Sequence, residues 1–457
     1  MKQFIAKFKR SVRISEAPAD PTTSDAAPKL VTIGSDVGHT EAEPQSTPSP
    51  KAKQQNCDSR LESLLPEVRR QLLSILDLRG LKLLVRASPT FHQQYLVDRK
   101  YLLCRSLEET LGSVAIDAYA VHKCTAQAGD TKQNTPWVPN SYSEQTSRRY
   151  LSLADKLTLD EAIRMAVFYF HSVKPITEYY ARWSLDNLAN EAGKDSHNHQ
   201  QEVTLTRTET MRLIRATYRF QLLCQLVEPA NKAMRLSRQE TVLDFLGVLE
   251  PWEIEELFSF YQFARDVYDR ILTDIRWDLH PDNPRFDDQG RPPTPEGAFD
   301  LDISTDRSNY LEGITLRGLS LLHTVLFKIK DHKHLVSTMQ QHITSSYIPF
   351  NALEGVLGET QQALRRRNHP SERDRMQEQR TPYPFRGDSE PDAPPLAWTI
   401  MWGNTYSNLY GWYIPEEMRR WGYVFWDAAT LEGMGGRRVL NRQWEEYWDN
   451  DPRDDLL

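Results

Sequence analysis

The chain has 457 residues, a formal net charge of −7, 39% hydrophobic residues and 26% charged residues. Its length allows two or three domains or one large helical unit. The acidic balance provides no general attraction for nucleic acid. No run of about 18 apolar residues predicts a membrane span, and no secretory signal is visible. We therefore expect a protein of the cytoplasm or nucleus.

The first 57 residues are predicted to be a disordered tail. Residues 16–57 are rich in Pro, Ser, Thr, Ala, Asp and Glu and hold few large apolar groups. Such a segment buries too little surface to offset the entropy lost on ordering. Residues 1–15 are basic, with Phe4, Phe8 and Val12 on one helical face. This pattern leaves open a mitochondrial presequence, a membrane-surface helix or a plain tail.

From Leu61 the pattern changes to a compact helical hairpin. Apolar residues recur every three to four positions, which is typical of one helix face. Pro66 is tolerated near the helix start because a first-turn N–H has no partner within the helix. Gly80 is predicted to break this helix. A second short helix then ends before Pro89. The hairpin shows more apolar surface than so small a unit can bury within itself.

The hairpin resembles an F-box, the module that docks substrate adaptors onto the Skp subunit of cullin-RING ubiquitin ligases. The resemblance rests on Leu65-Pro66-Glu67-Val68, then Ile75-Leu76-Asp77-Leu78 with Leu81, then Arg86-Ala87-Ser88-Pro89-Thr90-Phe91. The segment looks like the divergent F-box-like segments of filamentous-fungal proteins. The resemblance implies a Skp interface that includes Leu64, Leu65, Pro66, Leu72, Ile75, Leu76, Leu81, Leu84 and Phe91. A hairpin buried against the later helices remains the alternative, since a Leu/Ile stripe is first a core signal.

Beyond residue 125, helical spacing continues and no β-alternation of useful length appears. Leu159, Ile163, Val167 and Phe170 predict a helix capped at Thr158. The predicted segments after the tail are 58–125 (F-box-like domain), 145–275 (helical body), 276–310 (acidic, Pro-rich loop), 311–366 (helical body continued), 367–395 (charged loop) and 396–450 (aromatic-rich helices).

Two longer helices are predicted within the body. A helix that begins after Pro175 precedes them. The first long helix covers residues 211–222, and the second begins near Trp252. Glu255 and Glu256 lie near the start of the second helix and suit its dipole.

The C-terminal segment is rich in aromatic residues at helical spacing. The first set is Trp398, Trp402, Tyr406 and Tyr410, and the second, after Pro415, is Met418, Trp421, Phe425 and Ala429. Each set predicts one amphipathic helix. The aromatic side chains are interpreted as core, and a recognition pocket is the alternative.

The sequence does not predict a catalytic centre. No phosphate-binding loop, dinucleotide fingerprint or nucleophile elbow occurs. The two H-x-H pairs are His197 with His199 and His332 with His334, and neither has a carboxylate at metal-ligand spacing. The four cysteines form no C-x-x-C pair. We expect no catalytic residue, no cofactor and no metal.

We therefore predict a mainly α protein, with an F-box-like hairpin followed by a multi-helix bundle. The expected function is a non-catalytic adaptor that docks on the Skp subunit and presents a helical surface to an unknown protein substrate. The alternative is a helical interaction or structural protein whose hairpin is only part of its core.

Overall fold

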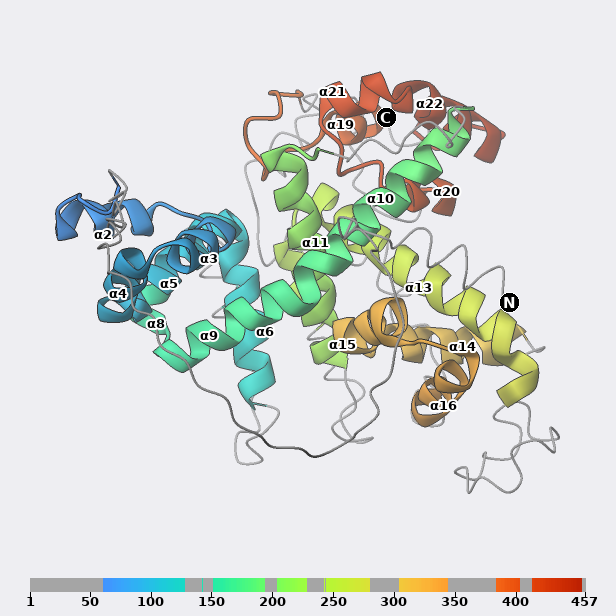
Figure 1. Cartoon of the computed structure of the whole chain (residues 1–457). Helices are drawn as coiled ribbons and strands as arrows, with labels where there is room; N and C mark the ends of the chain where they lie inside the picture. The colour runs from blue at the N-terminus through green and yellow to red at the C-terminus, as the bar shows by residue number, and fades with distance from the viewer. Residues whose placement is uncertain are drawn as a thin grey trace, which may run out of the picture. The chain divides into compact units, whose positions relative to one another are not determined.

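The computed structural model describes residues 61–127, 142, 151–193, 204–227, 242, 244–279, 304–343, 384–402 and 413–453. Every regular element in these ranges is helical, which confirms the predicted mainly α fold (Figure 1). The chain divides into two compact units, Met1–Leu64 and Leu65–Leu457, and all helices below belong to the second. The predicted disordered tail lies outside the described residues. None of the described helices has the length and apolarity that crossing a membrane requires.

The N-terminal hairpin consists of short helices joined by tight caps. They are α2 (Pro66–Ser74), α3 (Leu78–Ala87), α4 (Pro89–Val97) and α5 (Arg99–Leu111). The predicted break at Gly80 is wrong. Gly80 lies in the first turn of α3 and donates its N–H to the N-cap Asp77 Oδ1 at 2.7 Å. Ser88 ends α3 and caps α4, accepting from Phe91 N at 3.3 Å. Each such cap contributes about 1 kcal/mol.

The hairpin has a small core of its own. Leu73, Leu81, Phe91 and Leu102 are buried together, one from each of its four helices. Six half-buried residues pack around them: Leu72, Leu76, Leu84, Val85, Tyr95 and Tyr101. Helix α5 also packs against α6 (Ala115–Gln127) and α9 (Leu159–Phe168), which connects the hairpin to the body.

Helix α9 begins where the sequence predicts. Thr158 and Glu161 form a capping box in which each side chain accepts from the other residue's backbone N–H. The helix then continues through a π-helical turn, η2 (Tyr169–Val173), into α10 (Lys174–Glu191). Two helices separated at Pro175 were predicted, but the run is continuous. The wider π turn accommodates the proline, which has no N–H and would clash in a regular α-helix.

The centre of the body is α11 (Arg207–Val227), which packs between α6 and α13 (Pro251–Leu279) (Figure 1). Most of its side chains are buried on all sides, as expected of a helix within a core. Helices α14 (Ser304–Thr315) and α16 (His332–Ile343) pack against α13. Helix α15 (Gly318–His323), which continues into a π-helical turn η6 (Thr324–Lys328), packs against α11 and η2. Helices α13 and α14 extend into both ends of the loop expected at 276–310. The predicted segment boundaries otherwise stay predictions.

Three buried arginines on one face of α11 form ion pairs with neighbouring helices. They are Arg212, Arg215 and Arg219. Arg215 makes a two-pronged contact with Glu256 of α13, at 2.8 and 2.6 Å. Arg219 Nε donates to Asp117 of α6 at 2.9 Å. These contacts fix α6, α11 and α13 to one another.

Two acids near the start of α13, which the sequence analysis assigned to the helix dipole, lie inside the protein. Glu255 and Glu256 are fully buried. Glu255 pairs with Arg419, with both N–O distances at 3.1 Å. A carboxylate this deep in a protein requires a cationic partner because burial without one costs several kcal/mol.

The C-terminal segment contains four described helices. They are α19 (Leu396–Trp402), α20 (Glu416–Arg420), α21 (Ala428–Gly433) and α22 (Gly436–Tyr447). One helix from Met418 to Ala429 was predicted, and this is wrong. Gly422, at φ +62°, ends α20 in a turn whose Phe425 N donates to Gly422 O. Tyr406 and Tyr410 lie outside the described residues.

The C-terminal indoles form core, as interpreted from the sequence. Trp398, Trp421 and Trp426 are fully buried. The Trp421 N–H donates to Gln443 at 2.8 Å, and the Trp426 N–H donates to the Trp421 carbonyl at 2.8 Å. These hydrogen bonds satisfy the polar atom of each ring inside the protein.

Candidate docking surface

Exposed apolar side chains gather on the hairpin. In the described part of the chain, ten large hydrophobic side chains are exposed, and six of them lie on helices α2–α4 or at the ends of these helices. They are Leu65, Val68, Ile75, Leu83, Leu96 and Val97. Single exposed apolar residues such as Val97 are normal, but the row of exposed apolar residues along α2 indicates an interaction surface.

We call Leu65, Pro66, Val68, Leu72 and Ile75 the α2 ridge. Val68, Leu72 and Ile75 are spaced by four and three residues, so they share one face of the helix. Leu65 is 68% exposed and Ile75 58% exposed. Leu73, on the opposite side of α2, points into the hairpin core. Helix α2 thus has apolar residues on two faces and buries only one of them fully.

The residues predicted for a Skp interface fall into three groups. Leu65, Pro66 and Ile75 are exposed. Leu64, Leu72, Leu76 and Leu84 are half-buried. Leu81 and Phe91 are buried in the hairpin core and are inaccessible to a partner in this conformation. Leu65 and Pro66 thus lie at the start of α2 and Ile75 at its end. Leu81 and Phe91 lie in the core against which α2 packs.

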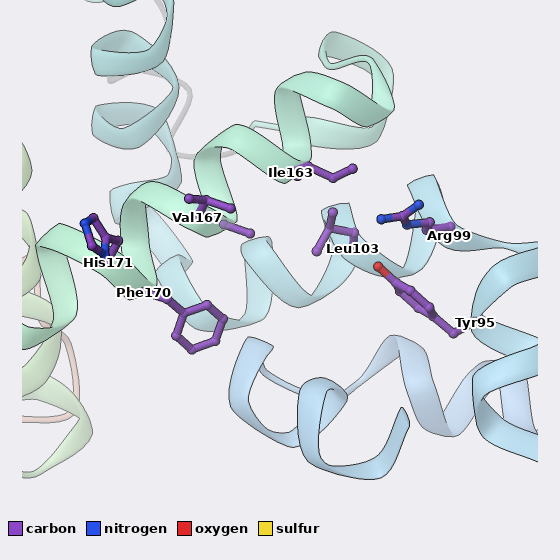
Figure 2. A pocket seen from close by; sticks show the side chains of 8 residues that line it. Tyr95, Arg99, Leu103, Ile163, Val167, Phe170 and His171 are labelled. Atoms are coloured by element: carbon purple, nitrogen blue, oxygen red, sulfur yellow. The ribbon is translucent and has the colours of Figure 1, made fainter. Parts of the chain in front are cut away.

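A second surface feature is an open groove of about 420 Å³. It lies where α4 and α5 face α9 and η2. Eight residues line it: Tyr95, Arg99, Leu103, Ile163, Ala166, Val167, Phe170 and His171. We call this the α5–α9 groove. Figure 2 shows Tyr95 and Arg99 at one end, His171 at the other, and Leu103 and Val167 between them.

The groove is apolar along its length, with Arg99 at one end and His171 at the other. Leu103 and Ala166 are buried at its base, whereas Val167 is 58% exposed. None of the eight lining residues is acidic. Nearby, Lys82 Nζ lies 5.0 Å from the centre of the Phe170 ring, a cation–π contact.

The groove ends at His171, whose ring contacts that of His323 in a tilted arrangement. The rings of His171 and His323 lie 4.7 Å apart. His171 lies within the π-helical turn η2, and His323 directly precedes the π-helical turn η6. Burial, together with the neighbouring His171, lowers the pKa of His323 to about 4, so its ring is neutral at physiological pH. π-Helical turns occur often at functional sites, which directs attention to this end of the groove.

Sequence reasoning missed this groove, although α9 carried a signal. Helix α9 buries Ala162, Met165 and Ala166. The apolar residues Ile163 and Val167 lie on an adjacent face. A helix with apolar residues on two faces leaves one of them for another contact. The residues that complete the groove, such as Arg99, are distant in sequence and reach it only through the fold.

Cys104, Cys124 and His332 carry groups that are either poorly reactive or already engaged. Burial raises the pKa of the Cys104 thiol to about 11 and that of Cys124 to about 12, so neither is a thiolate at neutral pH. His332 of the predicted H-x-H pair contacts Asp278 at 2.6 Å. His197 and His199 lie outside the described residues. Within those residues, no group of three or more His, Cys, Asp or Glu could hold a metal ion.

No family model, no curated protein and no solved structure matches this chain, so the geometry of the two surfaces carries the functional argument.

Proposed function

We propose that this chain is a non-catalytic adaptor whose α2 ridge docks on the Skp subunit of a cullin-RING ubiquitin ligase. Its helical body would then present a surface to a protein substrate. The observation that best supports this is the exposure of the α2 ridge. The Leu65-Pro66 entry and Ile75, which carry the resemblance to an F-box, are among the most exposed apolar groups of the described chain.

The free energy available from this ridge is substantial. Fully burying one Leu or Ile side chain contributes about 1.5–3 kcal/mol. Leu65 and Ile75 are each more than half exposed, so most of that term remains for a partner. An apolar helix face that fits a partner groove is a common mode of recognition.

The second candidate function is a helical interaction or structural protein that never meets a ligase. It is favoured by the burial of Leu81 and Phe91. These two residues already serve the hairpin's own core, so part of the F-box-like pattern is explained by folding alone.

Titration of the purified full-length chain with a purified Skp subunit, followed by calorimetry, separates the two candidates. The test variant is Leu65→Asp with Ile75→Asp, and the matched control is Val97→Asp, since Val97 is 80% exposed and outside the α2 ridge. Losing two apolar contacts of this size should weaken binding at least about 100-fold. The control should bind like the parent protein.

Circular dichroism and a thermal melt establish that the variants remain folded. Absence of Skp binding by the parent chain, or equal binding by the ridge variant and the control, would contradict the adaptor. A ridge variant that loses its fold while the control keeps it would favour the second candidate.

A further inference from the structure

We infer that the α5–α9 groove is a docking site for a short peptide segment of a partner protein, one that combines bulky apolar side chains with a nearby carboxylate. The groove shares no residue with the α2 ridge. The inference therefore goes beyond the proposed ligase docking and does not depend on it.

The apolar base of the groove is the reason to expect bulky apolar side chains in the peptide. Leu103 and Ala166 form the base, and Ile163 and Phe170 are half-buried beside them. Val167 remains 58% exposed because no described element covers it. The groove therefore has exposed apolar surface that a bulky side chain of the partner can cover.

The positive charges of Arg99 and Lys82 are the reason to expect a carboxylate in the peptide. Among the described residues, Arg99 forms no ion pair, and its guanidinium lies 6.0 Å from the centre of the Tyr95 ring. The neighbouring acid, Asp98, is paired with Arg70 at 3.1 Å. Lys82 over the Phe170 ring adds a second positive charge. A segment with a carboxylate beside its apolar anchors complements this arrangement, whereas a basic segment would be repelled.

The shape of the groove favours a peptide over a small metabolite. Small-molecule sites bury most of their ligand inside a concave pocket. This groove is open along one side, and its polar groups lie at opposite ends, as Figure 2 shows for Arg99 and His171. An elongated occupant can contact both ends, and side chains anchored in an apolar groove are the usual basis of peptide recognition.

The test uses random peptides displayed on phage and selected on the full-length chain. A chain with Val167→Asp and Arg99→Glu serves for counter-selection. Both substituted side chains are exposed, so the fold should persist, and circular dichroism checks this. The enriched peptides should share at least two large apolar residues and an Asp or Glu. No enrichment over the variant chain, or a basic consensus, would overturn the inference.

Fluorescence anisotropy of the selected peptides then tests each contact. Val167→Asp should weaken binding roughly tenfold or more, because an apolar contact is lost and a like charge introduced. Arg99→Glu should weaken acidic peptides roughly fivefold and should favour analogues with Lys in place of the acid. Val97→Asp is the matched control and should have no effect. Equal affinities for all four proteins would overturn the inference.

Sedimentation of the chain alone tests a different occupant. Self-association that Val167→Asp abolishes and Val97→Asp does not would assign the groove to a second copy and overturn the peptide. Skp binding gives a separate readout. Val167→Asp should leave it unchanged, so failure of the peptide inference and failure of the adaptor proposal are distinguishable.

Discussion

Replacing Arg215 by methionine should destabilise the fold through the charge that it leaves behind. Arg215 Nε and Nη2 donate to the two oxygens of Glu256 at 2.8 and 2.6 Å. Its guanidinium also donates to Asp392 Oδ1 at 2.6 Å and to the Pro391 carbonyl at 2.9 Å. Glu256 has no solvent exposure. The substitution therefore leaves a carboxylate with neither water nor its main cation.

The expected cost is about 3–5 kcal/mol, the range found when one partner of a buried ion pair is removed. This is a large part of the 5–15 kcal/mol that typically holds a native protein together. The cost should depend on pH. Burial already raises the pKa of Glu256, although Arg215 opposes this. Without Arg215 the pKa rises further, so the variant should regain stability as the pH falls and Glu256 binds a proton in the folded state.

Urea unfolding followed by circular dichroism at pH 8 and pH 5.5 measures both effects. Arg207→Met is the matched control on the same helix. The Arg207 side chain is 72% exposed and forms a surface pair with the Glu109 carboxylate at 3.3 Å and a hydrogen bond to the Glu109 carbonyl at 3.4 Å, so its loss should cost less than about 0.5 kcal/mol. The double variant Arg215→Met with Glu256→Leu should be at least about 2 kcal/mol more stable than the sum of the single effects. Equal costs for Arg215→Met and Arg207→Met, or strict additivity in the double variant, would refute the reasoning.

Three further predictions concern the core, a turn and acid sensitivity, and urea unfolding measures all of them. Phe91→Ala should cost about 3–5 kcal/mol because it empties the hairpin core, whereas Val97→Ser at the exposed end of α4 should change stability by less than about 0.5 kcal/mol. Gly422→Ala should cost roughly 1–3 kcal/mol, since φ is +62° and a Cβ would lie 2.8 Å from a phenylalanine ring carbon. Gly433→Ala, with open space for a Cβ, should be neutral or stabilising. Burial lowers the pKa of His323 to about 4, so the contribution of its neutral ring to the free energy of unfolding is complete above pH 6.5 and is lost as the pH falls toward 4. His323→Gln should therefore reduce the loss of stability between pH 7 and pH 5 by about 1 kcal/mol.

Local rules account for what the sequence predicted well. The capping box of Thr158 and Glu161 is a short-range pattern, and the structure contains it. The long helix α11 followed from the spacing of apolar residues that pack on both sides of it. Helix starts and helix faces depend on residues within one or two turns, so a single sequence holds the necessary information.

Long-range pairing accounts for much of what the sequence could not predict. Arg212, Arg215 and Arg219 have the spacing of a solvated helix face, and so do Glu253 and Glu256. Arg215 and Arg219 are buried against Glu253 and Glu256, on a helix about 40 residues further along the chain, and Arg212 is buried against Asp427. No local pattern distinguishes two solvated charged faces from two faces that neutralise each other inside a core. Their burial becomes evident only once both helices are placed.

The two candidate surfaces were predictable to different degrees for the same reason. The α2 ridge was anticipated in part because Leu65 and Ile75 belong to one short segment. What the sequence could not decide was which leucines of that segment turn inward; Leu81 does, and it lies with Phe91 in the hairpin core. The α5–α9 groove forms because the fold places Arg99 of α5 and Val167 of α9 along the same hollow. Neither residue alone indicates a groove in the sequence.

The buried network also bears on whether the hairpin can act as a docking platform. Binding is stronger when the surface is already in its bound shape, since less entropy is lost on association. Helix α5 carries the hairpin and packs on α6. Helix α6 is held in turn by Asp117, which accepts from Arg219 of α11 at 2.9 Å and also from the Tyr142 hydroxyl. A rigid α6 fixes the position of α5, and α5 forms one wall of the groove as well as the base on which α2 rests. Loosening the Asp117–Arg219 pair should therefore weaken partner binding at both surfaces together, although neither residue reaches the partner.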